Sequence, residues 1–160
     1  ERLDISGTVD AVKVIRGKAI IRDSWFHDSY YQATGAGSSD GQTHNDGIQV
    51  EGGANTVITG NRIEGFHNAA IMVTQNVALI DGLRIEGNQL SGGACSINMA
   101  EGGKGPLRGV KILSNKFSGP FTKPDFECPM IWPSTTKPEL KGNTWLGSST
   151  EAVPRKGGVA

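Results

Sequence analysis

One eight-residue phrase returns five times along this chain of 160 residues and restricts the possible folds more than any other feature. The phrase reads apolar, any, apolar, any, small, Asn or Ser, any, large apolar. Its sixth position is occupied in turn by Ser24, Asn61, Asn88, Asn115 and Asn143, which follow one another at steps of 37, 27, 27 and 28 residues. A period of about 20 to 50 residues is typical of proteins that stack one small unit on the next.

A second set of alternating residues lies between the copies of the first. Its members are Val12-Lys-Val14, Ile48-Gln-Val50, Ile71-Met-Val73, Ile97-Asn-Met99 and Met130-Ile-Trp132. Side chains that alternate with period two mark half-buried strands. Two strand columns per period, separated by Gly and Asn turns, predict an all-β right-handed parallel β-helix of about five to six rungs over residues 1–147, with 148–160 as a tail, linker or loose cover.

Stacking of the rungs predicts the core. One interior stripe contains Ile21, Ile58, Ile85, Ile112 and Leu140, and another contains Phe26, Ile63, Leu90, Phe117 and Trp145. The Asn column is interpreted as structural, because Asn tolerates left-handed turn angles and can hydrogen-bond to the Asn above and below it. An antiparallel β-sandwich would not explain residue types that recur at about 27-residue steps.

The two cysteines fall in one column of this register. Cys95 and Cys128 each precede a matched interior residue by two positions, so they are predicted to touch, either as a disulfide or as stacked free thiols. The pair is compatible with an oxidising, extracellular setting.

Composition excludes several functions. Lys and Arg together balance Asp and Glu at 16 each and are spread along the chain, so nucleic acid is not an expected partner. The longest mostly apolar stretch, Ala69 to Val73, is far shorter than the roughly 20 residues of a membrane-spanning helix, so no membrane anchor is expected. Because the chain starts with Glu1 and not Met, we expect a processed form or part of a longer chain.

Function is expected where the repeat breaks, in the long interval from His27 to Asn45. Long loops on a rigid scaffold are common sites of binding and catalysis. The candidate catalytic residues are His44, Asp46, Tyr30 and Tyr31. The register aligns His44 with His67 and predicts that the two rings stack, and the tyrosines can offer a platform to a sugar. The alternatives are that Asp46 before Gly47 only forms a turn and that the histidines only cap the corner of the coil.

Neighbouring positions on the loop and the adjacent strand face complete the candidate site. The predicted ligand-binding residues are Lys13, Asp28, Gln49, Glu51, His67 and Asn98. A lyase acting on an acidic sugar would also need cations, for which Lys13, Arg16, Lys18 and Lys104 are candidates. No cofactor or metal site is predicted, because His-Asn-Asp alone supplies too few ligands, although a bound Ca²⁺ without a motif is conceivable.

The repeat together with Thr43-His-Asn-Asp-Gly-Ile-Gln49 resembles the pectate-lyase-like superfamily of right-handed β-helix proteins. The phrase is similar to one in β-helix domains of actinobacterial secreted proteins and phage tail proteins. The resemblance covers about Leu3 to Leu146 and implies a polysaccharide lyase, glycosidase, epimerase, or non-catalytic tail or surface module. The chain lacks the Asp-Pro-His-Asp, Gly-His-Gly and Arg-x-Pro-x-x-Arg motifs of the enzymes, which favours a module.

Three functions are therefore expected, in order of preference. The first is an extracellular or virion-associated module that contacts a polysaccharide through residues 27–49 and the adjacent strand face. The second is a lyase or epimerase that uses His44 and a nearby Tyr, and the third is a structural tail or adhesin segment without a ligand. Because an exposed final rung is an open edge, a homo-oligomer or a parent chain is expected to cover it.

Overall fold

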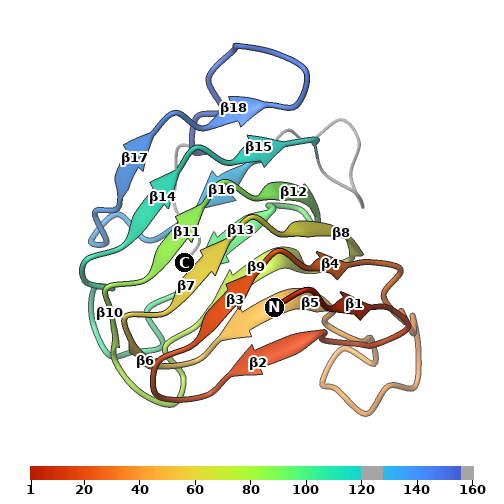
Figure 1. Cartoon of the computed structure of the whole chain (residues 1–160). Helices are drawn as coiled ribbons and strands as arrows, with labels where there is room; N and C mark the ends of the chain where they lie inside the picture. Colours follow the sequence, from red (N-terminus) through yellow and green to blue (C-terminus); the bar gives the residue numbers. More distant parts are fainter. Residues whose placement is uncertain (120–127, 156–160) are drawn as a thin grey trace.

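The chain winds into a coil of short strands, as the computed structural model shows for residues 1–119 and 128–155 (Figure 1). Three parallel sheets run along the coil, and each turn of the chain adds one strand to each of them. Sheet A contains β1 (Asp4–Ile5), β4 (Trp25–Phe26), β8 (Arg62–Phe66), β12 (Gln89–Gly92), β15 (Lys116–Phe117) and β18 (Thr144–Trp145). Sheet B contains β2 (Val12–Val14), β5 (Asp46–Val50), β9 (Ala69–Val73), β13 (Ile97–Met99) and β16 (Met130–Ile131).

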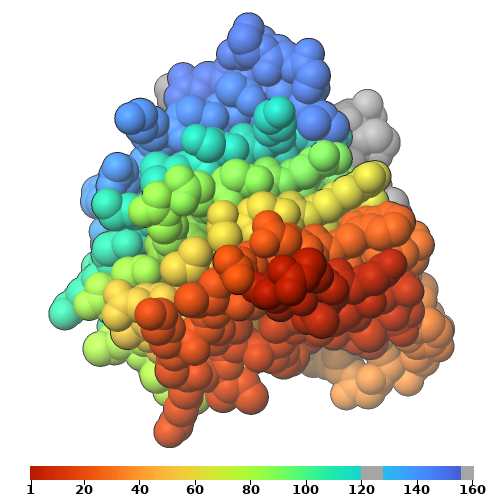
Figure 2. Space-filling view, viewed as in Figure 1, coloured from red at the N-terminus to blue at the C-terminus, as the bar shows by residue number. Residues whose placement is uncertain are grey.

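Sheet C and a small fourth sheet complete the wall of the coil. Sheet C contains β3 (Ile20–Arg22), β7 (Val57–Thr59), β11 (Arg84–Glu86), β14 (Lys111–Leu113) and β17 (Glu139–Lys141). The fourth sheet pairs β6 (Gly53–Ala54) with β10 (Ile80–Asp81). The chain rises steadily through the stack, so bands of successive sequence colour lie one above another (Figure 2). The predicted all-β solenoid with about five to six rungs is confirmed.

The register between rungs is the one that the repeat predicts. Ile21 pairs with Ile58, Ile58 with Ile85, and Ile85 with Ile112 in sheet C. Phe26, Ile63, Leu90 and Phe117 are aligned in sheet A and are fully buried. The end of the interior stripe is less covered, since Leu140 keeps 36% of its surface exposed. Each rung therefore has a dry core only because a neighbouring rung covers it.

The Asn column forms a continuous hydrogen-bonded ladder inside the coil. The main-chain and side-chain nitrogens of Asn61 both donate to Oδ1 of Asn88, at 2.9 and 3.0 Å. Asn88 makes the same pair of bonds to Asn115, and Asn115 makes it to Asn143. Each side-chain amide also donates to a carbonyl of the preceding rung, as Asn88 Nδ2 does to Ile58 O at 2.9 Å. The structural interpretation of these residues is confirmed.

The left-handed turn angle belongs to the residue before each Asn and not to the Asn itself. This position has a φ of 54° at Asp23 and between 53° and 66° at Gly60, Gly87, Ser114 and Gly142. The expectation that Asn supplies the left-handed conformation is therefore wrong. The preceding position makes the turn, which is why it accepts only small or short polar residues, and the Asn is left free to form the ladder.

The last rung is covered in part by the chain that follows it. Glu151 pairs antiparallel with Thr144, and Ala152 N donates to Asn143 O at 3.0 Å. Ala152 is buried in the same core as the rungs, and Arg155 N donates to Met130 O. Residues 148–155 thus act as a cover, while residues 156–160 of the predicted tail, with Gly157 and Gly158, lie outside the described residues.

Cys95 and Cys128 are joined by a disulfide between neighbouring rungs, with their Cα atoms 4.6 Å apart. Both are buried and pack with Ile131 in a small cluster separate from the main core.

The part of the chain that the structure describes contains no helix long and apolar enough to cross a membrane.

The Asn ladder generates a stability prediction. In Asn88→Ala, the ladder loses its acceptor for Asn61 and its donor to Ile58 O and Asn115, all of them buried. Unsatisfied buried groups cost about 1–3 kcal/mol each, so we expect the free energy of unfolding in urea to fall by roughly 3 kcal/mol or more. Gln89→Ala, at the adjacent outward-facing residue that begins β12, is the control and should change the free energy of unfolding by less than about 0.5 kcal/mol. Equal losses for the two variants would contradict a special role of the ladder.

Candidate functional site

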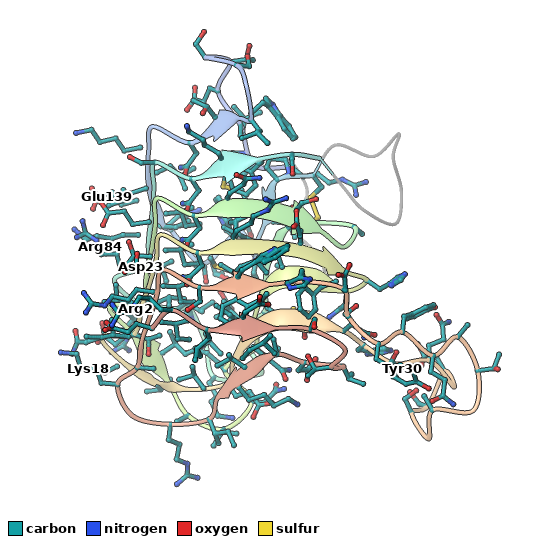
Figure 3. The ribbon with its side chains drawn as sticks, turned by 45° about the vertical axis from the view of Figure 1, so that its right-hand side comes forward. Arg2, Lys18, Asp23, Tyr30, Arg84 and Glu139 are labelled. Carbon is teal, nitrogen blue, oxygen red and sulfur yellow. A yellow bond between two sulfur atoms is a disulfide. The ribbon has the colours of Figure 1, made fainter. Side chains whose placement is uncertain are left out.

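The break in the repeat is a loop that leaves the coil between β4 and β5. It projects from the body of the molecule near the first rungs, and Tyr30 lies on it (Figures 1 and 3). The loop is closed on itself by main-chain bonds, from Thr43 N to Gln32 O at 2.9 Å and from Ala36 N to Gly41 O at 2.9 Å. It is also tied to the first rung, because Tyr30 N donates to Thr8 O at 2.8 Å. The insertion is therefore an ordered platform.

Asn45, Asp46 and Gly47 of the His44-Asn-Asp-Gly47 phrase join the loop to the coil. Asn45 is fully buried, and its Nδ2 donates to Tyr30 O at 2.6 Å, which holds the base of the loop against the coil. Gly47 is required by close packing, since a Cβ there would lie 2.3 Å from Ile63 Cγ2 and 2.6 Å from Ala70 O. The Asp-Gly pair thus begins β5 and does not form the turn considered from the sequence.

A hollow of about 300 Å³ lies between the loop and the residues that lead into β9 and β13. We call it the loop hollow. All of its lining residues except Ala94 carry a polar side-chain group, and the loop supplies more than half of them. The lining residues are Tyr31, Asp40, Gln42, Thr43, His44, His67, Asn68 and Ala94.

An aromatic stack forms one wall of the loop hollow. The Tyr31 ring lies against the His67 ring with their centroids 3.8 Å apart, and Tyr31 Oη donates to Gln42 Oε1 at 2.6 Å. Burial lowers the pKa of His67, which favours a neutral imidazole at neutral pH. The predicted stacking of His44 on His67 is not observed, because the loop places Tyr31 over that ring.

His44 and Asp40 form the opposite wall. His44 Nε2 lies 2.8 Å from Asp40 Oδ2, and both side chains are largely exposed. Asp40 also accepts from Ser38 Oγ at 2.9 Å and from Gln42 N at 3.1 Å. The bond from His44, together with those two donors, lowers the pKa of Asp40 to about 2. The loop hollow therefore carries a permanently ionised carboxylate that is oriented toward an imidazole.

Asp46 does not line the loop hollow and is buried behind it, with 2% of its surface exposed. Its Oδ1 accepts from Asn68 Nδ2 at 2.8 Å, and its own main-chain N donates to Asp10 Oδ1 at 2.9 Å. Asp10 in turn pairs with Lys13 at 3.0 Å. Burial raises the pKa of Asp46 to about 7, and the Asp10 charge adds to this against the opposing bond from Asn68. Direct contact of Asp46 with a substrate is excluded by this position.

The other predicted ligand-binding residues are spread over the surface. Asp28 lines a different hollow beside sheet A, with Trp25, Glu64 and His27, and its carboxylate lies 2.7 Å from His27 Nδ1. Tyr30 is on the loop but not among the lining residues, and its side chain is well exposed. Lys13, Gln49 and Glu51 lie on the sheet B side of the coil, outside the loop hollow.

Asn98 lines a second hollow, of about 510 Å³, at the far end of the sheet B strands. We call it the strand-face hollow. Most of its walls are apolar, but Glu101 supplies a carboxylate whose Oε1 accepts from the hydroxyls of Thr135 and Thr136, at 2.6 and 2.7 Å. The lining residues are Met72, Asn98, Met99, Ala100, Glu101, Gly102, Gly103 and Pro133.

Sequence reasoning missed four polar residues of the loop hollow, namely Asp40, Gln42, Thr43 and Asn68. Asp40 and Gln42 were inside the predicted loop but had no spacing signal to distinguish them. Asn68 follows His67 in the same register as Asn45 follows His44, and that alignment is the signal that could have identified it. Within residues 1–119 and 128–155, no three His, Cys, Asp or Glu side chains are grouped so that they could hold a metal ion.

Comparison with known proteins identifies the architecture and not an activity. The family profile described as a right handed beta helix region matches residues 3–145. No curated protein and no solved structure matches the chain.

The buried carboxylate generates a pH prediction. Because the pKa of Asp46 is raised to about 7, the folded protein retains a proton that the unfolded chain releases between about pH 4 and 7. This proton favours the folded state at low pH, so stability should be lost as pH rises through that window, by up to about 1.4 kcal/mol per pH unit. Urea unfolding of wild type and Asp46→Asn from pH 4 to 8 measures this loss. The free energy of unfolding of wild type should fall relative to that of Asp46→Asn as pH rises from about 4 to 7, and the difference should level off above pH 8. Parallel curves for the two proteins would show that Asp46 does not titrate in this range.

Proposed function

The chain belongs to the right-handed β-helix family, and on that basis we propose that it is a carbohydrate-binding module that contacts a polysaccharide through the loop hollow and the adjacent face of sheet B. The observation that supports this most is the loop hollow itself. It joins an aromatic stack to carboxylate, amide, hydroxyl and imidazole groups within about 300 Å³. Sugars present apolar C–H faces and hydroxyls together, and this combination of groups complements both.

The charge of the loop hollow favours an uncharged polysaccharide. Among its described lining residues there is no Lys or Arg, and Asp40 is ionised over the physiological range. Of the cations considered from the sequence, Lys13 pairs with Asp10 and Lys18 lines a hollow on sheet C. Lys104 Nζ donates to Asn76 O. A uronate would therefore be repelled by the Asp40 carboxylate and would find no Lys or Arg among the described lining residues.

A polymer fits the site better than a single sugar because sheet B carries two hollows. The loop hollow reaches Asn68, directly ahead of β9, and the strand-face hollow begins at Met72 on β9. Four residues of strand separate these positions by roughly 13 Å. A chain of several sugar rings can cover that distance, and Asn98 and Glu101 would then contact its far part.

An extracellular or virion-associated location is part of this proposal. The disulfide between Cys95 and Cys128 supports it, because such bonds persist in oxidising compartments. The exposed apolar side chains of the first coil, Leu3, Val9 and Ile15, support an association with a second copy or a longer parent chain at that end.

A polysaccharide lyase or epimerase is the second candidate, and the His44–Asp40 pair favours it. A carboxylate that orients an imidazole is a common arrangement for a general base. Neither Asp46 nor Tyr30 lines the hollow, so Tyr31 is the tyrosine that such an enzyme would use.

The binding proposal is tested by a matched pair of tyrosine variants. On a panel of neutral and uronate-containing polysaccharides, wild type should bind one or more neutral polymers. Tyr31→Ala removes the ring stacked on His67 and should weaken that binding by about tenfold, because a lost aromatic contact costs roughly 1.5 kcal/mol. Tyr30→Ala, an exposed neighbour outside the hollow, should leave it within about twofold. No binding to any polymer would favour the structural segment without a ligand.

The enzyme candidate needs a separate assay. Elimination from a uronate creates a double bond, so a lyase would raise the ultraviolet absorbance of a polyuronate solution, and NMR of the product would detect epimerisation. We expect neither change for wild type, because the described lining of the loop hollow contains no Lys or Arg to bind the carboxylate. Activity that is present in wild type and lost in His44→Gln would overturn the binding-module proposal.

A further inference from the structure

The loop hollow has a buried ionisable group directly behind its wall. Asn68 lines the hollow, and on its other side its Nδ2 donates to Oδ1 of the buried Asp46 at 2.8 Å. The main chain of Asn68 is also held in place, because Asn68 N donates to Asn45 O at 2.9 Å. One side chain thus joins the surface of the proposed sugar site to a carboxylate that is shielded from solvent.

We propose that Asp46 is a positioning residue: its carboxylate holds the Asn68 amide so that the carbonyl oxygen of Asn68 faces the loop hollow, and this hold weakens when Asp46 takes up a proton. The inference rests on the proposed function, since it assigns the group that a sugar hydroxyl meets. Asp46 then acts through Asn68 and does not itself contact the ligand.

The orientation follows from donor and acceptor chemistry. An ionised carboxylate can only accept hydrogen bonds, so the NH₂ group of Asn68 must point toward Asp46 and its oxygen must point away. A charge-assisted bond of this kind is about twice as strong as a neutral one. When Asp46 is protonated, the hydrogen bond from Asn68 loses its charge assistance, and the carboxyl group gains an O–H donor. The side-chain amide of Asn68 is then no longer held in one orientation.

The groups that face Asp46 come from each neighbouring segment. Asp10, ahead of β2, adds negative charge, while Lys13 on β2 and His44 at the end of the loop oppose it. Asn68, ahead of β9, supplies the hydrogen bond. Burial outweighs these contributions and keeps the carboxyl within reach of protonation near neutral pH. A sugar hydroxyl that donates to Asn68 Oδ1 would therefore bind better at alkaline than at acidic pH.

The experiment observes Asn68 without any ligand. In NMR spectra recorded from pH 5 to 9, the side-chain NH₂ resonances of Asn68 should shift with one midpoint near pH 7 in wild type and stay constant in Asp46→Asn. The amide of Gln75, a buried side chain that donates to Gly105 O at 2.7 Å, is the internal control and should not move. A constant Asn68 signal in wild type, or an unchanged titration in Asp46→Asn, would overturn the inference.

A second variant keeps the test independent of any folding defect at Asp46. Lys13→Gln removes a cation that favours the charged carboxylate, so the midpoint seen at Asn68 should move to higher pH. An unmoved midpoint, or one that moves to lower pH, would show that Asp46 is not the group that titrates and would overturn the inference.

Binding assays separate this inference from the function on which it rests. Any polysaccharide retained on the panel should bind wild type roughly two- to tenfold more tightly at pH 8.5 than at pH 5.5, because one hydrogen bond is gained. Asp46→Asn should lose that dependence. Titration of Asn68 without binding to any polymer would reject the proposed function alone, whereas binding with no pH dependence would reject the positioning role.

Discussion

Hydrogen bonding between rungs is the constraint on which the rest of this protein depends. No single turn of the coil contains enough apolar surface to fold alone, so a dry interior exists only after neighbouring strands have paired in register. The Asn ladder secures that register from the inside, because Asn61, Asn88 and Asn115 each donate twice to the next Asn and once to the preceding rung. A slip of one residue would expose a buried amide and every isoleucine of the stripe.

The regular coil also supports the irregular insertion between β4 and β5. Because the coil beneath it is rigid, a loop with little regular structure can still hold Tyr31 over His67 and Asp40 beside His44. Asn45 and Asp46 connect the two parts, one through Tyr30 O and the other through Asn68. The polar surface offered to a ligand is therefore set by buried groups of the coil as much as by the loop.

Charge separates the possible functions more clearly than shape does. The loop hollow contains an ionised Asp40, and its described lining has no Lys or Arg. On sheet C, by contrast, Arg84 pairs with Glu86 and Lys111 pairs with Glu139. An acidic polysaccharide would need the reverse arrangement. The proposed recognition of an uncharged polymer by an aromatic stack and amide groups is consistent with this distribution.

The sequence by itself determined the coil, its register and the position of Cys95 next to Cys128 on adjacent rungs, because a period of about 27 residues leaves one way to bury each stripe. It also indicated residues 27–49 as the region of the proposed site. Only the tertiary structure decided which residues of that region meet. Tyr31 replaces His44 over His67, Asp46 lies behind Asn68, and Asp28 belongs to another hollow. An irregular loop has no repeat to predict its contacts, since the packing of its side chains against the coil determines them.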